Sequence, residues 1–88
     1  MRRILAWRDA VVYRHQGFSF FFYSHEGDPR EPPHVHVRRD GAEAKFWLTP
    51  VVRRAWDRRF DARALKIIET VVIEHRHEFE EQWHVFFA

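Results

Sequence analysis

The amino-acid sequence predicts an α+β domain in which a three- or four-stranded antiparallel sheet packs against one long C-terminal helix. Residues 18–48 contain an aromatic run and two segments of alternating polarity, which are typical of strands. From residue 61 onward the apolar side chains recur at helical spacing instead. The 88 residues suffice for one small domain, and nine Phe and four Trp provide large side chains for its core.

The first 17 residues are expected to be a lead-in of undecided structure, followed by a single domain over residues 18–88. Residues 4–15 contain β-branched and aromatic side chains, but the charged pair Arg8-Asp9 interrupts them. A pair of strands and an irregular segment both fit this pattern. Gly17 ends the segment.

Residues 18–23 predict a strand that is buried on both faces. Every second residue from Phe18 to Phe22 is a phenylalanine, and the opposite face carries Phe21 and Tyr23. The polar residues that follow include three prolines between positions 25 and 33, so they predict a surface loop with a stiff, extended end.

Residues 34–39 and 42–48 predict a β-hairpin, because the Asp-Gly pair between them is a favoured two-residue turn. In the second strand, period two gathers the apolar side chains on one face and leaves Glu43, Lys45 and Trp47 on the other. Residues 51–56 fit either a short edge strand or a single helical turn.

A helix of roughly 25 residues is expected to begin after Asp61, which is a suitable N-cap. Its apolar stripe has spacings of three and four residues and is interrupted by one polar side chain, His75. The stripe comprises Leu65, Ile68, Val72, His75, Phe79, Trp83 and Phe86.

Composition excludes several classes of function and location. The chain has no cysteine, which excludes disulfides, thiolate metal sites and cysteine nucleophiles and fits a reducing compartment. No apolar run approaches the ~20 residues of a membrane span, and Arg8 and Asp9 interrupt any signal-peptide core. We therefore expect a cytoplasmic protein with no membrane contact.

The charges are unevenly distributed along the chain. Residues 1–66 carry fourteen basic and eight acidic side chains, whereas residues 67–88 carry one basic and five acidic side chains. Opposed halves suit a protein partner or self-association, and arginine pairs suit phosphate groups, although a solvated face that partly neutralises the acidic C-terminal segment is the simpler explanation. The candidate contacts for a partner or a nucleic acid are Arg38, Arg39, Lys45, Trp47, Arg53, Arg54, Arg58 and Arg59.

Three of the seven histidines are candidates for chemistry. His34 and His36 are two residues apart on a strand, so they share one face, and His75 is expected to point inward toward the sheet. Imidazoles that converge in this way are candidate ligands of a divalent metal or candidate acid-base catalysts, with Arg38 and Lys45 as phosphate contacts. Purely structural roles for the three rings remain an open alternative.

Two sequence elements and the helix resemble a bacterial family, domain of unknown function 4160. The elements are the run Phe20-Phe21-Phe22-Tyr23-Ser24 and the segment Pro32-Pro33-His34-Val35-His36-Val37, and the helical part includes Glu74-His75-Arg76. Arg59 stands where the family commonly has a glycine. The resemblance implies a small prokaryotic protein, often encoded beside a member of domain of unknown function 2442 in pairs that look like toxin–antitoxin modules. It implies no catalytic residues.

The leading hypothesis is a protein-binding module that forms one half of a toxin–antitoxin-like pair with a small protein encoded nearby. One alternative is a nuclease toxin that acts on RNA or DNA through His34, His36 and His75, with or without a metal. The other alternative is a nucleic-acid-binding autoregulator that uses the arginine pairs. Whether the protein is an enzyme stays undecided at this level.

Overall fold

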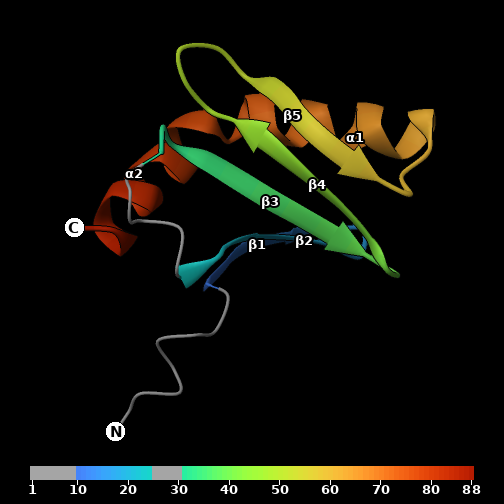
Figure 1. Ribbon diagram of the computed structural model, residues 1–88, viewed down its shortest axis with the longest axis horizontal. Helices are drawn as coiled ribbons and strands as arrows, with labels where there is room; N and C mark the ends of the chain where they lie inside the picture. The colour runs from blue at the N-terminus through green and yellow to red at the C-terminus, as the bar shows by residue number, and fades with distance from the viewer. Residues whose placement is uncertain (1–9, 25–30) are drawn as a thin grey trace, which may run out of the picture.

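The computed structural model of the chain describes residues 10–24 and 31–88, which form a five-stranded sheet and two helices (Figure 1). In chain order the elements are β1 (Ala10–His15), β2 (Phe18–Phe22), β3 (His34–Arg39), β4 (Ala42–Trp47), β5 (Arg53–Arg58), α1 (Ala62–Glu74) and α2 (Arg76–Phe86). Each strand pairs antiparallel with the next one, so the order of strands in the sheet is their order in the chain.

The α+β class is confirmed, but the sheet has five strands where three or four were predicted. β1 comes from the predicted lead-in, of which residues 1–9 lie outside the described residues. Of the undecided segment 51–56, residues 53–56 belong to the edge strand β5, which continues to Arg58 and has every residue exposed or half-buried. Both additional strands lie at sheet edges, where a strand needs no buried face and so shows little apolar alternation.

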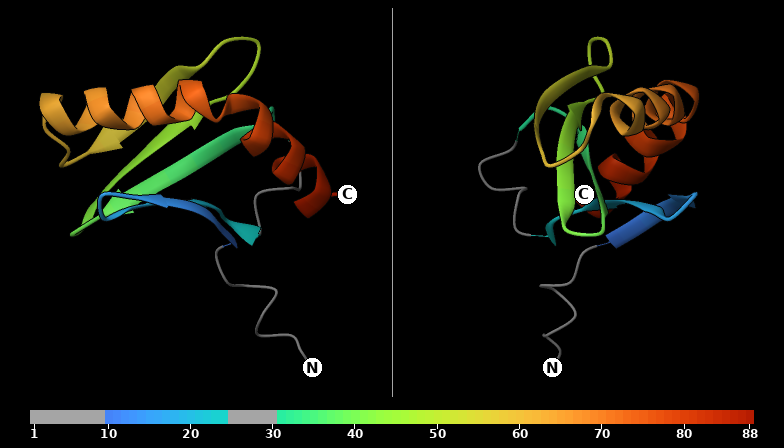
Figure 2. Two further views of the ribbon diagram at one scale, coloured as in Figure 1. Left: turned by 180° about the vertical axis from the view of Figure 1, so that it is seen from behind. Right: turned by 90° about the vertical axis from the view of Figure 1, so that its right-hand side faces the viewer.

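The predicted single helix is two helices that meet at His75. His75 has φ −106° and ψ 15°, which are not helical values, and α2 turns away from α1 there, with both helices on one side of the sheet (Figure 2). The amide of His75 still donates to the Val71 carbonyl (3.0 Å), and its carbonyl accepts from the Phe79 amide (2.9 Å). These bonds keep the helical spacing on both sides of His75, so the apolar pattern of the sequence does not reveal the bend. Neither helix is long and apolar enough to cross a membrane.

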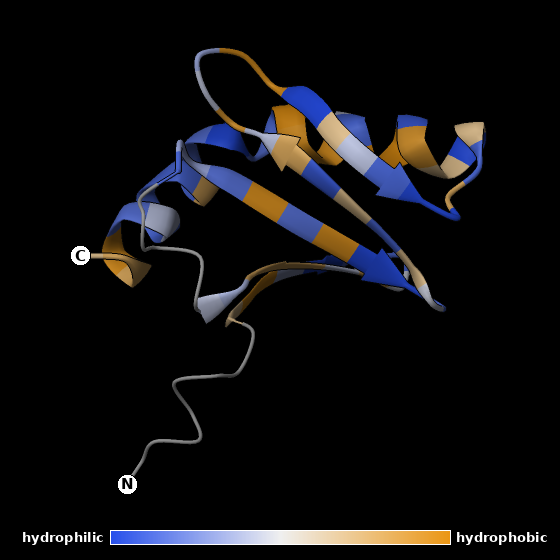
Figure 3. Cartoon of the chain, in the orientation of Figure 1, coloured by the Kyte–Doolittle hydropathy of each residue, from blue (hydrophilic) through white to orange (hydrophobic). Residues whose placement is uncertain are grey.

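The core lies between the two helices and one face of the sheet (Figure 3). The alternation predicted for residues 18–23 and 42–48 is confirmed for the phenylalanines of β2 and for Ala42, Ala44, Phe46 and Leu48, which are all buried, whereas Tyr23 lies beyond the end of β2 and is half-buried. Phe86, the last member of the predicted stripe, is 38% exposed and does not belong to the buried cluster. That cluster comprises Phe18, Phe20, Phe22, Val35, Val37, Ala44, Phe46, Leu48, Ala64, Ile68, Val71, Val72, Phe79 and Trp83.

Two hairpins share one turn geometry. Asp40 and Gly41 have φ values of 51° and 84°, as the two central residues of a type I′ turn require, and the predicted hairpin is confirmed. Gln16 and Gly17 have φ values of 50° and 83° and join β1 to β2 in the same way. The expected N-cap is also present, because the Asp61 carboxylate accepts the Ala64 amide at 2.8 Å.

Candidate functional site

The three candidate histidines do not form one site. His34 and His36 alternate along β3 with Val35 and Val37, which face the helices, so their rings lie on the opposite, helix-free face. At the start of the strand the His34 ring still reaches Trp83 of α2, at 6.4 Å between ring centroids. His75 lies on the helix side, with its ring centroid 4.3 Å from that of Tyr13. Because the sheet separates them, the predicted three-histidine cluster is not formed. Within residues 10–24 and 31–88, no three His, Cys, Asp or Glu side chains are grouped so as to hold a metal ion.

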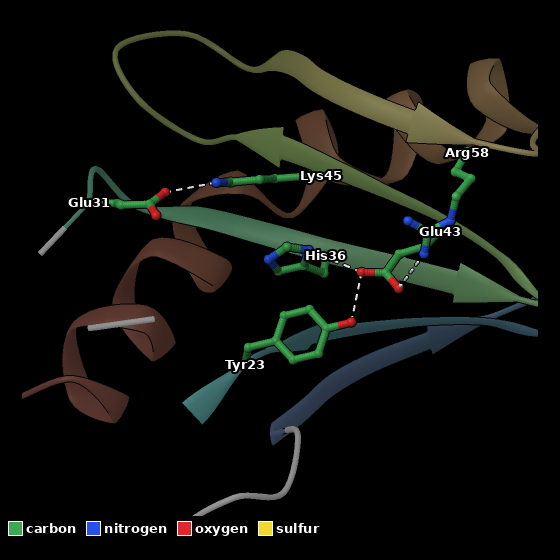
Figure 4. A network of polar contacts seen from close by, with 6 residues as sticks. All are labelled: Tyr23, Glu31, His36, Glu43, Lys45 and Arg58. Carbon is green, nitrogen blue, oxygen red and sulfur yellow. Dashed lines mark hydrogen bonds and ion pairs between the residues drawn. The ribbon is translucent and has the colours of Figure 1, made fainter. Parts of the chain in front are cut away.

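Glu43 of β4 is the centre of a polar network on the helix-free face (Figure 4). The Tyr23 hydroxyl donates to Glu43 Oε2 at 2.8 Å, and His36 Nδ1 lies 3.5 Å from the same oxygen. An Arg58 guanidinium nitrogen lies 3.6 Å from Oε1. The Glu43 side chain is only 13% exposed, so these three groups replace most of the water that a carboxylate would otherwise bind.

Lys45 forms a second polar contact on this face. Its Nζ lies 2.7 Å from Glu31 Oε1 and 4.4 Å from the centre of the Trp47 ring, while its side chain is only 11% exposed. The sequence placed Lys45 on the polar face of its predicted strand. The structure pairs its largely buried ammonium with a carboxylate from the segment before β3, a partner that strand alternation does not reveal.

The two strand histidines are packed rather than accessible, since each is 1% exposed. His34 Nδ1 lies 2.9 Å from the carbonyl oxygen of Pro32, and because a carbonyl only accepts, this nitrogen carries the hydrogen. The His36 ring packs against Tyr23, at 4.6 Å between centroids, and Phe21, at 5.5 Å. An imidazole beside a carboxylate can act as an oriented base, but a substrate has no direct path to rings this deeply buried. In this arrangement both rings serve the packing of the sheet face.

The predicted arginine pairs are divided between the two faces of the sheet, because neighbouring residues of a strand point in opposite directions. Arg54 pairs with Phe46, a core residue, and approaches Asp57 at 3.8 Å. Arg39 donates to the Gln16 carbonyl at 3.2 Å and lies 3.9 Å above the Phe18 ring. Arg59 follows β5. The helix-free side keeps Arg38, Arg53 and Arg58, together with Lys45, Trp47 and Trp56.

Trp56 is a residue that the sequence analysis did not select. It lies opposite Lys45 in the β4–β5 ladder and is 38% exposed, although its ring also reaches His36 at 5.9 Å between centroids. A signal was available in principle, because Trp56 lies two residues before Arg58 and so shares its face, but a register irregularity between Lys45 and Phe46 puts Arg54 on the opposite face.

A separate feature is an apolar groove between α2 and the β1–β2 hairpin. Its volume is about 310 Å³, and Val85, at 77% exposure, forms part of its rim. The exposure of Phe86 is explained by its place in this groove rather than in the core. The lining residues are Ala10, Val12, Phe22, Glu81, Gln82, Val85 and Phe86.

Comparisons with known proteins identify a family but no activity. No curated protein and no solved structure matches this chain. The family described as Domain of unknown function (DUF4160) matches residues 17–84, which include β2 to β5, α1 and nearly all of α2. The match therefore covers the sheet face with the Glu43 network as well as the helical layer, and the chain belongs to this family.

Proposed function

We propose that the chain is a small cytoplasmic protein-binding module that forms one half of a toxin–antitoxin-like pair. The observation that supports binding is the apolar groove between α2 and the β1–β2 hairpin. Val85 and Phe86 are 77% and 38% exposed there, next to the apolar side chains of Val12 and Phe22. Each Å² of apolar surface that a partner removes from water stabilises the complex by about 25 cal/mol before the costs of association.

The charges around the groove indicate what kind of partner it accepts. Glu81 lines the groove, and α2 as a whole carries three glutamates against one arginine. That arginine, Arg76, lies 3.4 Å from Glu80. The fitting ligand is therefore an amphipathic segment of another protein, with apolar side chains for the groove and Lys or Arg beside them. The family resemblance supports a particular source, namely the small protein encoded next to this one.

The binding part is tested by co-expression of the chain with that neighbouring protein, followed by size-exclusion chromatography with light scattering. We expect one complex at micromolar concentration and its loss in Val85→Glu, which places a charge in the groove. Since Val85 is 77% exposed, this variant should fold normally. Val51→Glu is the matched control, because Val51 is 62% exposed and lies outside the groove.

Two outcomes would contradict the proposal. If the co-expressed proteins elute as independent monomers, or if Val85→Glu and Val51→Glu behave alike, the groove does not bind this partner. If the chain alone dimerises and Val85→Glu abolishes the dimer, the groove is an interface between two copies.

The toxin–antitoxin part has its own test. Expression of one protein of the pair should arrest growth, and co-expression of the other should relieve the arrest. If neither protein affects growth, the pair is a complex of another kind, and the binding result stands separately.

A further inference from the structure

The helix-free face of the sheet carries tryptophans and arginines in register. In the β4–β5 ladder Trp47 lies opposite Arg53, and Glu43 lies opposite Arg58. Directly paired residues of antiparallel strands point to the same side, so these side chains leave the sheet together. With Trp56 and with Arg38 of β3, they form what we call the Trp56 surface. It consists of Arg38, Trp47, Arg53, Trp56 and Arg58.

This surface is the accessible half of a face whose other half is packed. Trp56 is 38% exposed and the Arg58 side chain 62% exposed, whereas His36, two strands away in the same cross-strand row as Trp56, is 1% exposed. Trp56 therefore keeps much of its indole in solvent, although large aromatic side chains contribute most to the stability of a fold or an interface when they are buried. The Arg58 guanidinium lies 5.7 Å from the Trp56 ring centre, so a cation flanks the exposed indole.

The charge of the surface is positive. Three of its five residues are arginines, and the acidic side chain beside them, Glu43, already contacts the Tyr23 hydroxyl as well as Arg58. The Arg53 side chain is exposed at the outer edge of the sheet, which in the described part of the chain has no further strand beyond β5. A ligand can therefore reach indole and guanidinium groups from the same direction.

We infer that the Trp56 surface binds single-stranded nucleic acid. Unpaired bases stack on exposed indoles, and guanidinium groups contact the phosphates of the same strand. A duplex cannot stack on Trp56 in this way, because its base faces are already stacked inside the double helix. The site is distinct from the groove, since the groove lies at α2, on the other side of the sheet. The inference does not depend on the proposed protein partner.

The test is fluorescence anisotropy of the full chain with a labelled 16-nucleotide strand of mixed sequence, as RNA, as DNA and as the DNA duplex. We expect the single strands to bind more tightly than the duplex. With three arginines as phosphate contacts, the plot of log K against log salt should have a slope of about −2. A preference for RNA would indicate contacts to the 2′-hydroxyl, and equal binding would indicate stacking and phosphate contacts alone. Both results support the inference.

Variants separate this surface from general positive charge. Trp56→Ala should weaken binding about tenfold, and Trp56→Phe should retain most of it. Arg53→Ala should make the salt slope shallower by about 0.7. Arg63→Ala, which removes an exposed arginine from α1, is the matched control and should leave both quantities unchanged. Circular dichroism checks that each variant is folded.

Several results would overturn the inference. Absence of binding at 50 mM salt would do so directly. Equal affinity for duplex and single strand, with no effect of Trp56→Ala, would show only non-specific attraction to polyanions. If heparin competes fully and Arg63→Ala weakens binding as much as Arg53→Ala does, the surface has no preference for nucleic acid and an acidic partner explains it better.

Discussion

The Tyr23 hydroxyl donates a 2.8 Å hydrogen bond to Glu43 Oε2, and this bond joins the end of β2 to β4 across the intervening strand β3. The bond lies above His36, whose Nδ1 is 3.5 Å from the same oxygen. Three strands of the helix-free face are thereby connected by one carboxylate. The network orders a sheet face that no helix covers.

Tyr23→Phe removes this hydrogen bond and keeps the ring. We expect the free energy of unfolding to fall by about 1–2 kcal/mol, because the bond is made to a carboxylate that is largely shielded from water. Urea denaturation followed by far-UV circular dichroism measures the change. Tyr13→Phe is the control and should change stability by less than about 0.5 kcal/mol, since it keeps the ring contacts with Phe20 and Phe79. Equal effects of the two variants would argue against a stabilising role for the Glu43 network.

The Lys45–Glu31 pair should respond unequally to removal of its two members. Glu31→Gln leaves an ammonium group that is 11% exposed without its carboxylate, whereas Lys45→Met leaves a carboxylate that is 39% exposed and can be hydrated. We expect Glu31→Gln to cost roughly 2 kcal/mol and Lys45→Met less than about 1 kcal/mol. Thermal and urea unfolding of both variants measure which one loses more stability. A larger loss in Lys45→Met than in Glu31→Gln would contradict this prediction.

The core on the helix side should be sensitive to truncation. Phe79 is 2% exposed and packs on Phe20 at 5.8 Å between ring centroids, so Phe79→Ala should cost about 3–5 kcal/mol through the cavity that it opens. Phe86→Ala removes the same side chain from a site that is 38% exposed and should cost about 1 kcal/mol. A comparable loss in the two variants would show that Phe86 belongs to the core after all.

Arg59 occupies a backbone conformation that favours glycine, with φ 73°. The resemblance to the family implies a glycine at this position, and the positive φ gives a physical reason for one. Arg59→Gly should therefore raise the free energy of unfolding by about 0.5–1 kcal/mol, because the steric strain that it relieves exceeds the added entropy of the unfolded chain. Arg63→Gly, in the interior of α1, is the control and should lower stability by about 1 kcal/mol. A loss of stability in Arg59→Gly would contradict this account.

Much of the fold could be predicted because local patterns impose it. The alternation of Phe18, Phe20 and Phe22 leaves one register in which the apolar side chains are buried, and Asp40-Gly41 accepts the positive φ values of a tight turn. Asp61 begins the helix at the expected position. The two edge segments stayed undecided between a strand and another structure, because their many exposed residues obscure the alternation, although Val12 and Tyr13 of β1 pack against the core.

The candidate site was predicted only in part. The sequence pairs His34 with His36 on one face, and that pairing is present. The two-residue turn also sets His36 opposite Lys45, on the polar face of the hairpin, and the helices pack on the other side, with Val35 and Val37. His75 consequently lies across the sheet from His36, although each residue points where its local periodicity requires.

Local periodicity, turn chemistry and helix capping depend on residues that are close together in the sequence. They establish the α+β class, the central hairpin and the start of the helical region. Tertiary contacts between segments far apart in the chain decide where the helical region bends. They also bring Tyr23, His36 and Arg58 together at Glu43. Such contacts are selected by the burial of the whole core, because the free energy gained there outweighs the preference of any single segment.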